Sequence, residues 1–395
     1  MTQFWIFIGF LSFVTGCGYF YLGIKFLHRT DLNSNLILFG WTSILLLWSI
    51  TPIAYIISLL ELLPGKSKSF SMVAFINFGF LTILLFFSIV SDIGFYFYTK
   101  FFIPDLANSP DGTISGQSRK DFLLNFINPS ILGISGLITG YGIHEATSDW
   151  TVESIYIPFS GLSEDLQNIK IVQISDIHVG PTIKKETIEK LVERVNSLKP
   201  DIIAITGDLV DGSVSSLRED VSPLMNLRSK LGTYFVTGNH EYYSGALAWI
   251  RELKSLGIKV LLNESDVLTI KNSRLLISGV TDYRASSILP EHATNPEICL
   301  VNNEHCDLKI LLAHQPKSVF RAAKAGFDLQ LSGHTHGGQY FPGNILIHLF
   351  QEYVVGLYKH ENTWLYVNRG TGYWGPPLRT GNKPEITEIF LQRAT

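Results

Sequence analysis

The feature that most constrains this chain is the uneven distribution of its charged residues. Residues 1–143 carry seven Lys/Arg and six Asp/Glu, whereas residues 144–395 carry 24 and 28. The first part contains four apolar runs, each close to the length of about 20 residues that a helix needs to cross a bilayer. These runs are Phe4–Ile24, Leu36–Leu60, Phe70–Phe97 and Phe122–Ile143. The sequence therefore predicts an all-α bundle of four transmembrane helices over residues 1–145, followed by a second domain over residues 150–395.

Three details of the apolar runs bear on their arrangement. The first run lacks the positively charged stretch of a cleaved signal peptide, so we expect it to remain as a span. Val14-Thr15-Gly16-Cys17 resembles a lipoprotein cleavage box, an alternative that the same lack of positive charge disfavours. Pro52 is expected to kink the second run without ending it. Asp92 in the third run could be a functional intramembrane acid, but it lies near the end of the run, so we expect it at the membrane interface.

The distribution of basic residues predicts the orientation in the membrane, because short loops rich in Lys and Arg stay in the cytoplasm. Five basic residues belong to the first and third loops and two to the second. They are Lys25, Arg29, Lys100, Arg119 and Lys120 against Lys66 and Lys68. This bias places the large C-terminal domain on the extracytoplasmic face.

The overall charge and the cysteines exclude several classes of protein. A net charge of −3 and the absence of a basic cluster exclude an electrostatic surface for nucleic acid. Three cysteines are too few for a disulfide framework, and none has zinc-finger spacing. Cys299 and Cys306 are close enough in sequence to pair in an oxidising compartment, but we expect two separate thiols.

In residues 152–395, short β-rich runs are each followed by a polar loop. Lys184–Leu198 has the length of a helix between two of these runs, which indicates an α/β sheet. The runs and their loops are Ile171–Ile174 with SDIHVG, Asp201–Ile205 with TGDLVDG, Thr233–Val236 with TGNHEYY, Leu308–Leu312 with AHQP, and a run ending at Leu331 with SGHTHGGQ. Ligands of such sheets bind at the carboxyl ends of the strands, so we expect one edge of the sheet to collect all five loops.

The polar loops share one type of chemistry. They supply carboxylate, imidazole and amide groups but no thiolate, which suits Mn, Fe or Zn rather than a Cys-type structural zinc site. The residues are Asp176, His178, Asp208, Asn239, His240, His314, His334 and His336. Residues separated by one position at a strand end point to the same side. Seven ligands are too many for one ion and suit two ions that share a carboxylate.

Each of these residues alone has a simpler interpretation. Asp176 and Asp208 are common turn or capping residues, Asn239 suits a left-handed turn, and His314 could be a core histidine. The glycines beside them could mark only tight turns. Five such loops in one order, all at strand ends, are not explained in this way.

The order D-x-H, G-D, G-N-H-E, A-H and G-H-x-H resembles that of the calcineurin-like metallophosphoesterase family, over roughly residues 152–395. With GHTHGGQ and the ending VNRGTGYWGPPLRTGNKPEITEIFL, it is most similar to the bacterial membrane-associated branch. The resemblance implies a four-layer α/β/β/α sandwich with a di-metal site at the sheet edge. The expected fold class is therefore α/β, preceded by the four-helix membrane domain. The expected location is the bacterial cytoplasmic (inner) membrane, with the catalytic domain outside the cytoplasm.

The resemblance also implies a role for each residue. One metal ion would be held by Asp176, His178, Asp208 and His336. The other would be held by Asp208, Asn239, His314 and His334, which makes Asp208 the bridge. His240 would face the substrate phosphate, stabilise its developing charge and protonate the leaving alkoxide. Glu241 would either orient the His240 imidazole or lie at the surface after a turn.

These roles imply a membrane-anchored enzyme that hydrolyses a phosphate ester or a phosphoanhydride. Two divalent ions would polarise the phosphoryl oxygens and acidify a bridging water, whose hydroxide attacks phosphorus in line with the leaving group. A site close to a bilayer raises the expectation of a lipid-linked substrate. Downstream residues could line the site or pack in loops: Tyr340, Arg369, Tyr373, Trp374 and Arg379.

Two other classes of protein are alternatives to an enzyme. A non-catalytic membrane receptor or scaffold could retain the same fold, but the complete set of ligand types argues against it. A transporter needs a polar pathway, and the near absence of charged residues from the apolar runs argues against that.

Overall fold

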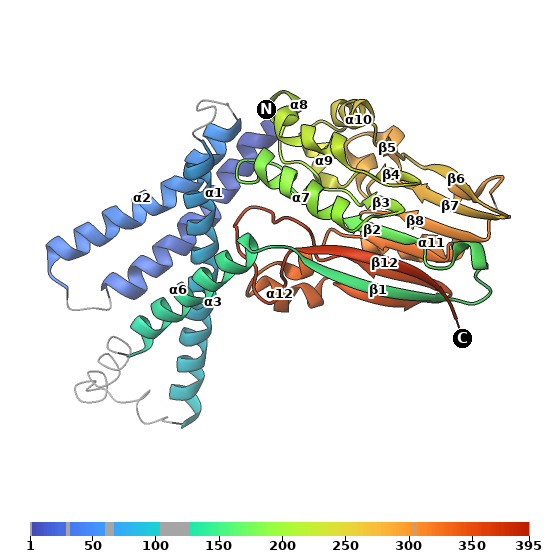
Figure 1. The fold of residues 1–395 in the computed structure, drawn as a ribbon. Coiled ribbons are helices and arrows are strands. Elements are labelled where there is room, and N and C mark those ends of the chain that lie inside the picture. The colour runs from blue at the N-terminus through green and yellow to red at the C-terminus, as the bar shows by residue number, and fades with distance from the viewer. Residues whose placement is uncertain (1, 29–31, 60–66, 103–125, 304, 395) are drawn as a thin grey trace. The chain divides into compact units, whose positions relative to one another are not determined.

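The structure, a computed structural model, describes residues 2–28, 32–59, 67–102, 126–303 and 305–394. The chain forms two compact units (Figure 1). One unit consists of Met1–His144 with Gly375–Leu378, and the other of Glu145–Trp374 with Arg379–Thr395.

The first unit is built from long apolar helices. They are α1 (Thr2–Gly23) with the π-helical turn η1 (Ile24–His28), α2 (Ser34–Leu59), α3 (Ser67–Phe102) and most of α6 (Asn128–Thr147). Within the described residues, three stretches are long and apolar enough to cross a membrane, namely Ile8–His28, Ser34–Ile57 and Lys68–Tyr98. Pro52 lies inside α2, which continues past it as predicted.

The fourth predicted span, Phe122–Ile143, is not among the described stretches that are long and apolar enough to cross a membrane. Residues 122–125 lie outside the described residues, and the rest overlaps α6. The sequence of α6, NPSILGISGLITGYGIHEAT, includes four glycines and several hydroxyl side chains, which lower its hydropathy. A fourth span therefore stays a prediction.

An ion pair joins η1 to α3 inside the first unit. Lys25 Nζ lies 2.7 Å from Asp92 Oδ1 and donates a second hydrogen bond, of 3.0 Å, to the carbonyl oxygen of Ser88. The hydroxyl of Tyr21 donates to the other carboxylate oxygen of Asp92 at 2.8 Å. The side chain of Lys25 is only 2% exposed. The sequence identified Asp92 as notable but did not reveal its partner.

Within the described residues, two six-stranded sheets form the centre of the second unit (Figure 1). The strand order of the first is β1 (Thr151–Phe159), β12 (Glu385–Arg393), β2 (Lys170–Ile174), β3 (Ile202–Ile205), β4 (Gly232–Phe235) and β5 (Lys259–Val260). The strand order of the second is β10 (Gly356–His360), β11 (Thr363–Val367), β9 (Leu329–Ser332), β8 (Leu308–Leu312), β7 (Ser273–Gly279) and β6 (Glu264–Ile270). Strands β2 to β5 are parallel, as are β7, β8, β9 and β11. The expected α/β fold is confirmed as two mixed sheets.

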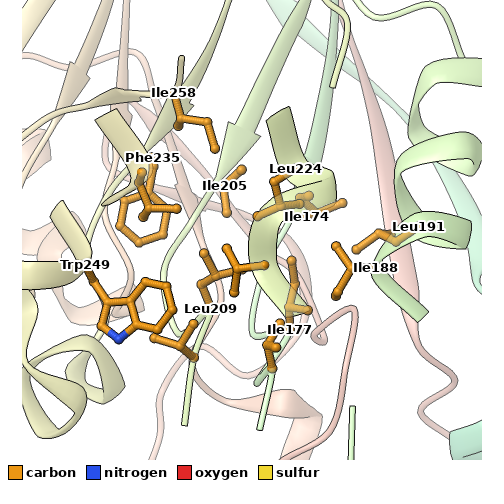
Figure 2. Packing of buried hydrophobic residues seen from close by; sticks show 14 of the residues in the cluster. Ile174, Ile177, Ile188, Leu191, Ile205, Leu209, Leu224, Phe235, Trp249 and Ile258 are labelled. Atoms are coloured by element: carbon orange, nitrogen blue, oxygen red, sulfur yellow. The ribbon is translucent and has the colours of Figure 1, made fainter. Parts of the chain in front are cut away.

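Alternation along the strands divides the hydrophobic core. In β3, Ile202 and Ala204 pack between the two sheets, whereas Ile203 and Ile205 face the opposite way, as the period of two requires. On that outer face they join residues of α7 (Lys185–Ser197), α8 (Val214–Val221) and α10 (Ala246–Ser255). Figure 2 shows Ile188 and Leu191 of α7 and Trp249 of α10 in this cluster. On the outer face of the second sheet, α11 (Val319–Ala325) contributes Ala322 to a smaller cluster.

The sequence located the strands well but not their sheets. Each of the five predicted runs ends within one residue of the end of an observed strand, and α7 matches the predicted helix closely. The expectation from the strand pattern that a single sheet edge collects all five loops is wrong, whereas the two β layers of the sandwich that the resemblance implied are present. The loops after β2, β3 and β4 belong to the first sheet and those after β8 and β9 to the second, because strand periodicity does not specify which strands pair. All three cysteines are free, and Cys299 and Cys306 are buried, as expected of separate thiols.

Candidate metal centre

All eight predicted site residues follow the carboxyl ends of strands. Asp176 and His178 follow β2, Asp208 follows β3, Asn239 and His240 follow β4, His314 follows β8, and His334 and His336 follow β9. Asn239 and His240 are also the first residues of the short helix α9 (Asn239–Ser244). Seven of the eight belong to three groups of ligand-type side chains, two of which share His178, and the structure thus brings residues of both sheets together.

The backbone of these loops is unusual. Five of the residues adopt a left-handed conformation that side chains other than glycine rarely take. Their φ angles are 53° at Asp176, 55° at His178, 51° at Asp208, 74° at His334 and 50° at His336. Such strained conformations concentrate at functional sites, where the surrounding structure holds them in place.

The first group consists of Asp176, His178 and His336. Nε2 of His178 lies 3.1 Å from Nε2 of His336, which in turn lies 3.4 Å from Oδ1 of Asp176. Two nitrogen ligands at about 2.0–2.1 Å from one ion lie about 2.9–3.4 Å apart when the angle between them is about 90–110°. The observed separation between the two imidazoles has this value.

The second group consists of Asp208, His314 and His334. Nε2 of His314 lies 3.2 Å from Nδ1 of His334 and 3.1 Å from Oδ2 of Asp208. The same carboxylate oxygen lies 4.0 Å from Nε2 of His178, a member of the first group. Asp208 therefore belongs to the second group and is also the carboxylate that approaches the first group. His334 and His336 belong to different groups, although a single residue separates them.

Asn239 provides an independent test of whether these residues fit metal ions. Its Oδ1 atom is buried and finds no hydrogen-bond donor among the described residues. An unsatisfied buried oxygen is costly and calls for a partner. The backbone N–H of the next residue, His240, donates to Oδ1 of Asp208 at 2.8 Å, so Asn239 adjoins the second group in the chain. An amide oxygen suits a cation, and with it the set contains the donor types that Mn, Fe and Zn accept.

Burial and charge control the protonation of the histidines. Burial, together with repulsion from His314, lowers the pKa of His334 to about 3. Burial and the neighbouring His178 hold the pKa of His336 well below its usual value. Both imidazoles are therefore neutral, which is the form that binds a metal. Burial also acts to lower the pKa of His314, but the carboxylate of Asp208 outweighs it and raises that pKa.

His240 is held by an acid that the sequence analysis did not single out. Nδ1 of His240 lies 2.5 Å from Oδ1 of Asp211, whose carboxylate also lies 3.1 Å from Nδ1 of His178. Burial acts to lower the pKa of His240, but Asp208 and Asp211 outweigh it and raise that pKa to about 9. Asp211 is the second acid of the TGDLVDG loop, and its position in that motif was the available signal.

Glu241 has a different role from either one predicted. It is fully buried, so it is not a surface acid. Its carboxylate accepts hydrogen bonds from the backbone N–H groups of Gly238, Asp208 and Leu209, at 2.6, 3.0 and 2.8 Å. It therefore fixes the turn that carries Asp208, while Asp211 is the acid that contacts His240.

Of the five downstream candidates for lining the site, Trp374 and Arg379 lie near it. The ring of Trp374 packs edge-on against that of His240, 5.6 Å between centroids, and is 49% exposed. Arg379 is fully buried and places Nη2 3.4 Å from Nδ1 of His336. Arg369 instead pairs with Glu153 and Glu385, and Tyr373 packs in the hydrophobic core. The carbonyl oxygen of Tyr340 accepts a hydrogen bond of 3.1 Å from the N–H of Asn344, in the turn that leads into α12 (Gly343–Leu346).

Comparison with known proteins shows which family the chain resembles. Residues 169–338 match the calcineurin-like phosphoesterase family. A bovine transmembrane protein with a metallophosphoesterase domain is 39% identical over 272 residues, which cover 66% of this chain and 61% of that protein. A zebrafish protein of the same name is 36% identical over 297 residues, covering 73% of this chain and 66% of that protein. The match therefore spans slightly less than two thirds of these two relatives.

A metallophosphoesterase of Helicobacter pylori is 38% identical over 281 residues, which cover 70% of this chain and 73% of that protein. Similar identity to animal and bacterial proteins does not single out the bacterial branch that the sequence predicted. The convergence of carboxylates and imidazoles at the strand ends agrees with these likenesses. The chain belongs to the calcineurin-like metallophosphoesterase family, whose members are dimetal-dependent phosphoric ester hydrolases.

Proposed function

We propose that this chain is a membrane-anchored di-metal phosphoesterase that hydrolyses a phosphate ester or a phosphoanhydride. The observation that carries the proposal is the pair of ligand groups with Asp208 between them. We assign one ion to Asp176, His178, Asp208 and His336. We assign the other to Asp208, Asn239, His314 and His334. When bound, the two ions would polarise the phosphoryl oxygens and acidify the water that attacks phosphorus.

The remaining site residues account for binding and proton transfer. Asp211 holds Nδ1 of His240, so Nε2 of that imidazole is left for the substrate. A protonated His240 would stabilise negative charge on the phosphate and deliver the proton on Nε2 to the departing oxygen. Trp374 and Tyr243 pack against the His240 ring and limit its rotation.

The membrane anchor is supported by the three apolar helices and by the relatives named as transmembrane proteins. We assign residues 1–145 to the membrane domain, with a fourth span over 122–143, and residues 150–395 to the catalytic domain. The loop charges support an extracytoplasmic catalytic domain on a bacterial inner membrane. Such a location would give the site access to lipid-linked phosphates, such as phospholipid head groups or lipid-carrier diphosphates.

The activity can be tested with the purified full chain in detergent. We expect hydrolysis of bis-p-nitrophenyl phosphate that a strong chelator abolishes and that Mn²⁺ restores better than Ca²⁺, because calcium prefers all-oxygen sites. Close to two ions should be bound per chain. Full activity in excess chelator would contradict the di-metal site. If the protein with metal bound hydrolyses neither diester nor monoester probes, the result would favour the non-catalytic receptor or scaffold.

The orientation needs its own test, because it determines which substrates reach the site. A reporter that is active only outside the cytoplasm, fused after Thr395, should be active in a bacterial host. The same reporter inserted near Gly112, which lies outside the described residues, should be silent. The reverse pattern would place the catalytic domain in the cytoplasm.

A further inference from the structure

The second unit exposes a group of large apolar side chains on the segment that follows the GHTHGGQ turn. In α12 (Gly343–Leu346), Ile345 is 60% exposed and Leu346 40% exposed. In and just after the 3₁₀ turn η10 (Ile347–Leu349), Leu349 is 75% exposed and Phe350 74% exposed. We call these four residues the apolar patch. Clustered exposure of this kind marks a contact surface for another molecule or a membrane.

The apolar patch is fixed to the turn that carries His336. Gly338 has a φ of +73°, and a Cβ atom there would collide with the backbone of Gly343 at the start of α12. The side chain of Asn344 donates a 3.0 Å hydrogen bond to the carbonyl oxygen of Thr380, and the N–H of Phe341 donates to the Thr380 hydroxyl at 2.8 Å. Any surface that engages the apolar patch therefore lies next to the metal-binding loops.

The chemistry of this segment matches that of a bilayer surface. From Tyr340 to Gln351 the sequence YFPGNILIHLFQ contains no Asp, Glu, Lys or Arg. Aliphatic side chains together with Tyr and Phe suit the boundary between lipid head groups and acyl chains. Four side chains are also few for a specific protein interface, which takes about 20–30 residues from each partner.

The same chain carries the helices that would keep the second unit close to a bilayer. The described residues include three helices that are long and apolar enough to span one, and β1 begins at Thr151, shortly after α6 ends at Thr147. Tethering makes the second contact intramolecular, so even a small apolar surface is sufficient to hold a domain at the membrane.

We propose that the apolar patch inserts into the interfacial layer of the bilayer and holds the metal-binding loops against the lipid surface. This inference rests on the membrane anchoring of the proposed function. It selects, among the phosphate esters that the site could hydrolyse, those whose phosphate lies at the level of the lipid head groups.

Insertion can be measured without any assay of activity. In a Cys17→Ser background, Leu349→Cys would carry a polarity-sensitive fluorophore, with the full chain reconstituted into phosphatidylcholine/phosphatidylglycerol nanodiscs. Cys299 and Cys306 are buried and should not react. The matched control is Val301→Cys, since Val301 is an apolar residue that is 56% exposed and lies outside the apolar patch.

We expect nitroxide-labelled lipids to quench the label at position 349 and aqueous iodide to quench the label at position 301. Quenching of both labels by iodide alone would overturn the proposal. Protection of the label at position 349 from both quenchers would also overturn it, because a second copy or another segment of the chain would then cover the apolar patch.

A second measurement connects the apolar patch to substrate choice. The double variant Leu349→Glu/Phe350→Glu should hydrolyse bis-p-nitrophenyl phosphate as the wild type does, since both residues are exposed and outside the site. Its hydrolysis of phosphatidyl-p-nitrophenol in vesicles, which has the same leaving group, should fall roughly tenfold or more. Equal loss on both substrates, or on neither, would contradict the proposal. If the wild type hydrolyses neither substrate, the proposed function fails while the fluorescence measurement still reports on insertion.

Discussion

Both units of this protein contain a cluster of charged side chains, but the charges in the two clusters are balanced in opposite ways. In the first unit, Lys25 and Asp92 neutralise each other, and further hydrogen bonds from Lys25 and Tyr21 are made within the protein. In the second unit, the carboxylates of Asp176 and Asp208 meet imidazoles instead, and the Asn239 oxygen finds no donor among the described residues.

The difference teaches how a structural cluster can be told from a ligand site. A buried charge is tolerated when a partner of opposite sign lies beside it, as in the Lys25–Asp92 pair. In the second unit, burial keeps His334 and His336 neutral, so the carboxylates of Asp176 and Asp208 are balanced only in part by His314 and gain further positive charge when cations bind. Substitutions in the two clusters should therefore affect different properties: folding stability in the first unit, and metal content and turnover in the second.

The largest effect is expected at Asp208, which stands between the two ligand groups. Asp208→Asn removes the shared anion, so metal content and hydrolysis should be lost together. Removing an outer partner of a metal ligand already costs about 10–100-fold in metal affinity, and the loss of a shared ligand should exceed this. Elemental analysis and turnover of the purified full chain would measure it. Asp220→Asn, at an acid that pairs with Lys184 away from the site, is the control and should resemble the wild type.

His240 should separate catalysis from metal binding. In His240→Ala the metal content should stay near that of the wild type, because His240 is assigned to the substrate. Turnover should fall by roughly 10²–10⁴-fold for an alkyl phosphate ester and by less for a p-nitrophenyl ester, whose leaving group needs little protonation. His360→Ala, which removes a histidine that contacts Tyr353, is the control. Loss of metal from His240→Ala, or unchanged turnover of the alkyl ester, would show that its role is misassigned.

In the first unit, substitutions should affect stability and leave the chemistry intact. Lys25→Met leaves the carboxylate of Asp92, which is 28% exposed, without its cation and should reduce the free energy of unfolding by about 1–3 kcal/mol, less than the loss of a fully buried pair would cost. The double variant Lys25→Met/Asp92→Leu removes both charges and should recover most of this loss. Thermal unfolding in detergent would compare the variants. If the double variant is as unstable as the single one, or if Lys25→Met loses bound metal while still folded, the contrast between the clusters fails.

The smallest effect is expected at Asp211, which contacts the site only through two histidines. Asp211→Asn keeps the shape of the side chain but removes the charge shared by His178 and His240. Turnover should fall by about 10–100-fold, with a modest decrease in metal affinity. Metal titration and turnover of the same preparation would measure both, with Asp220→Asn again as the control. A loss as complete as that in Asp208→Asn would mean that Asp211 is itself a ligand.

The sequence predicted the parts of the site that local patterns encode. The ends of β2, β3, β4, β8 and β9 could be read because a β-rich run gives way to a glycine-containing or polar loop at each. The eight residues in those loops were identified as one set because each follows a predicted strand and each has a side chain of a type that binds metal ions. The structure places seven of them in close groups, and their individual roles stay predictions.

What the sequence did not show depends on contacts between distant segments. Lys25 and Asp92 are 67 residues apart, and no periodicity links them. Glu241 is adjacent to His240 in sequence, yet its carboxylate contacts the backbone of Gly238, Asp208 and Leu209, because α9 directs it into the core. The assignment of strands to two sheets likewise depends on pairing, which the alternation of side chains does not encode.

The position of β12 also determines when the catalytic unit can be completed during protein synthesis. This strand lies between β1 and β2 in the first sheet, although it follows every other described strand in the chain. Until it leaves the ribosome, β1 lacks its sheet neighbour and one edge of β2 is open to solvent. Strands with open edges readily pair with other chains, so the unfinished second unit is exposed to aggregation until β12 takes its place.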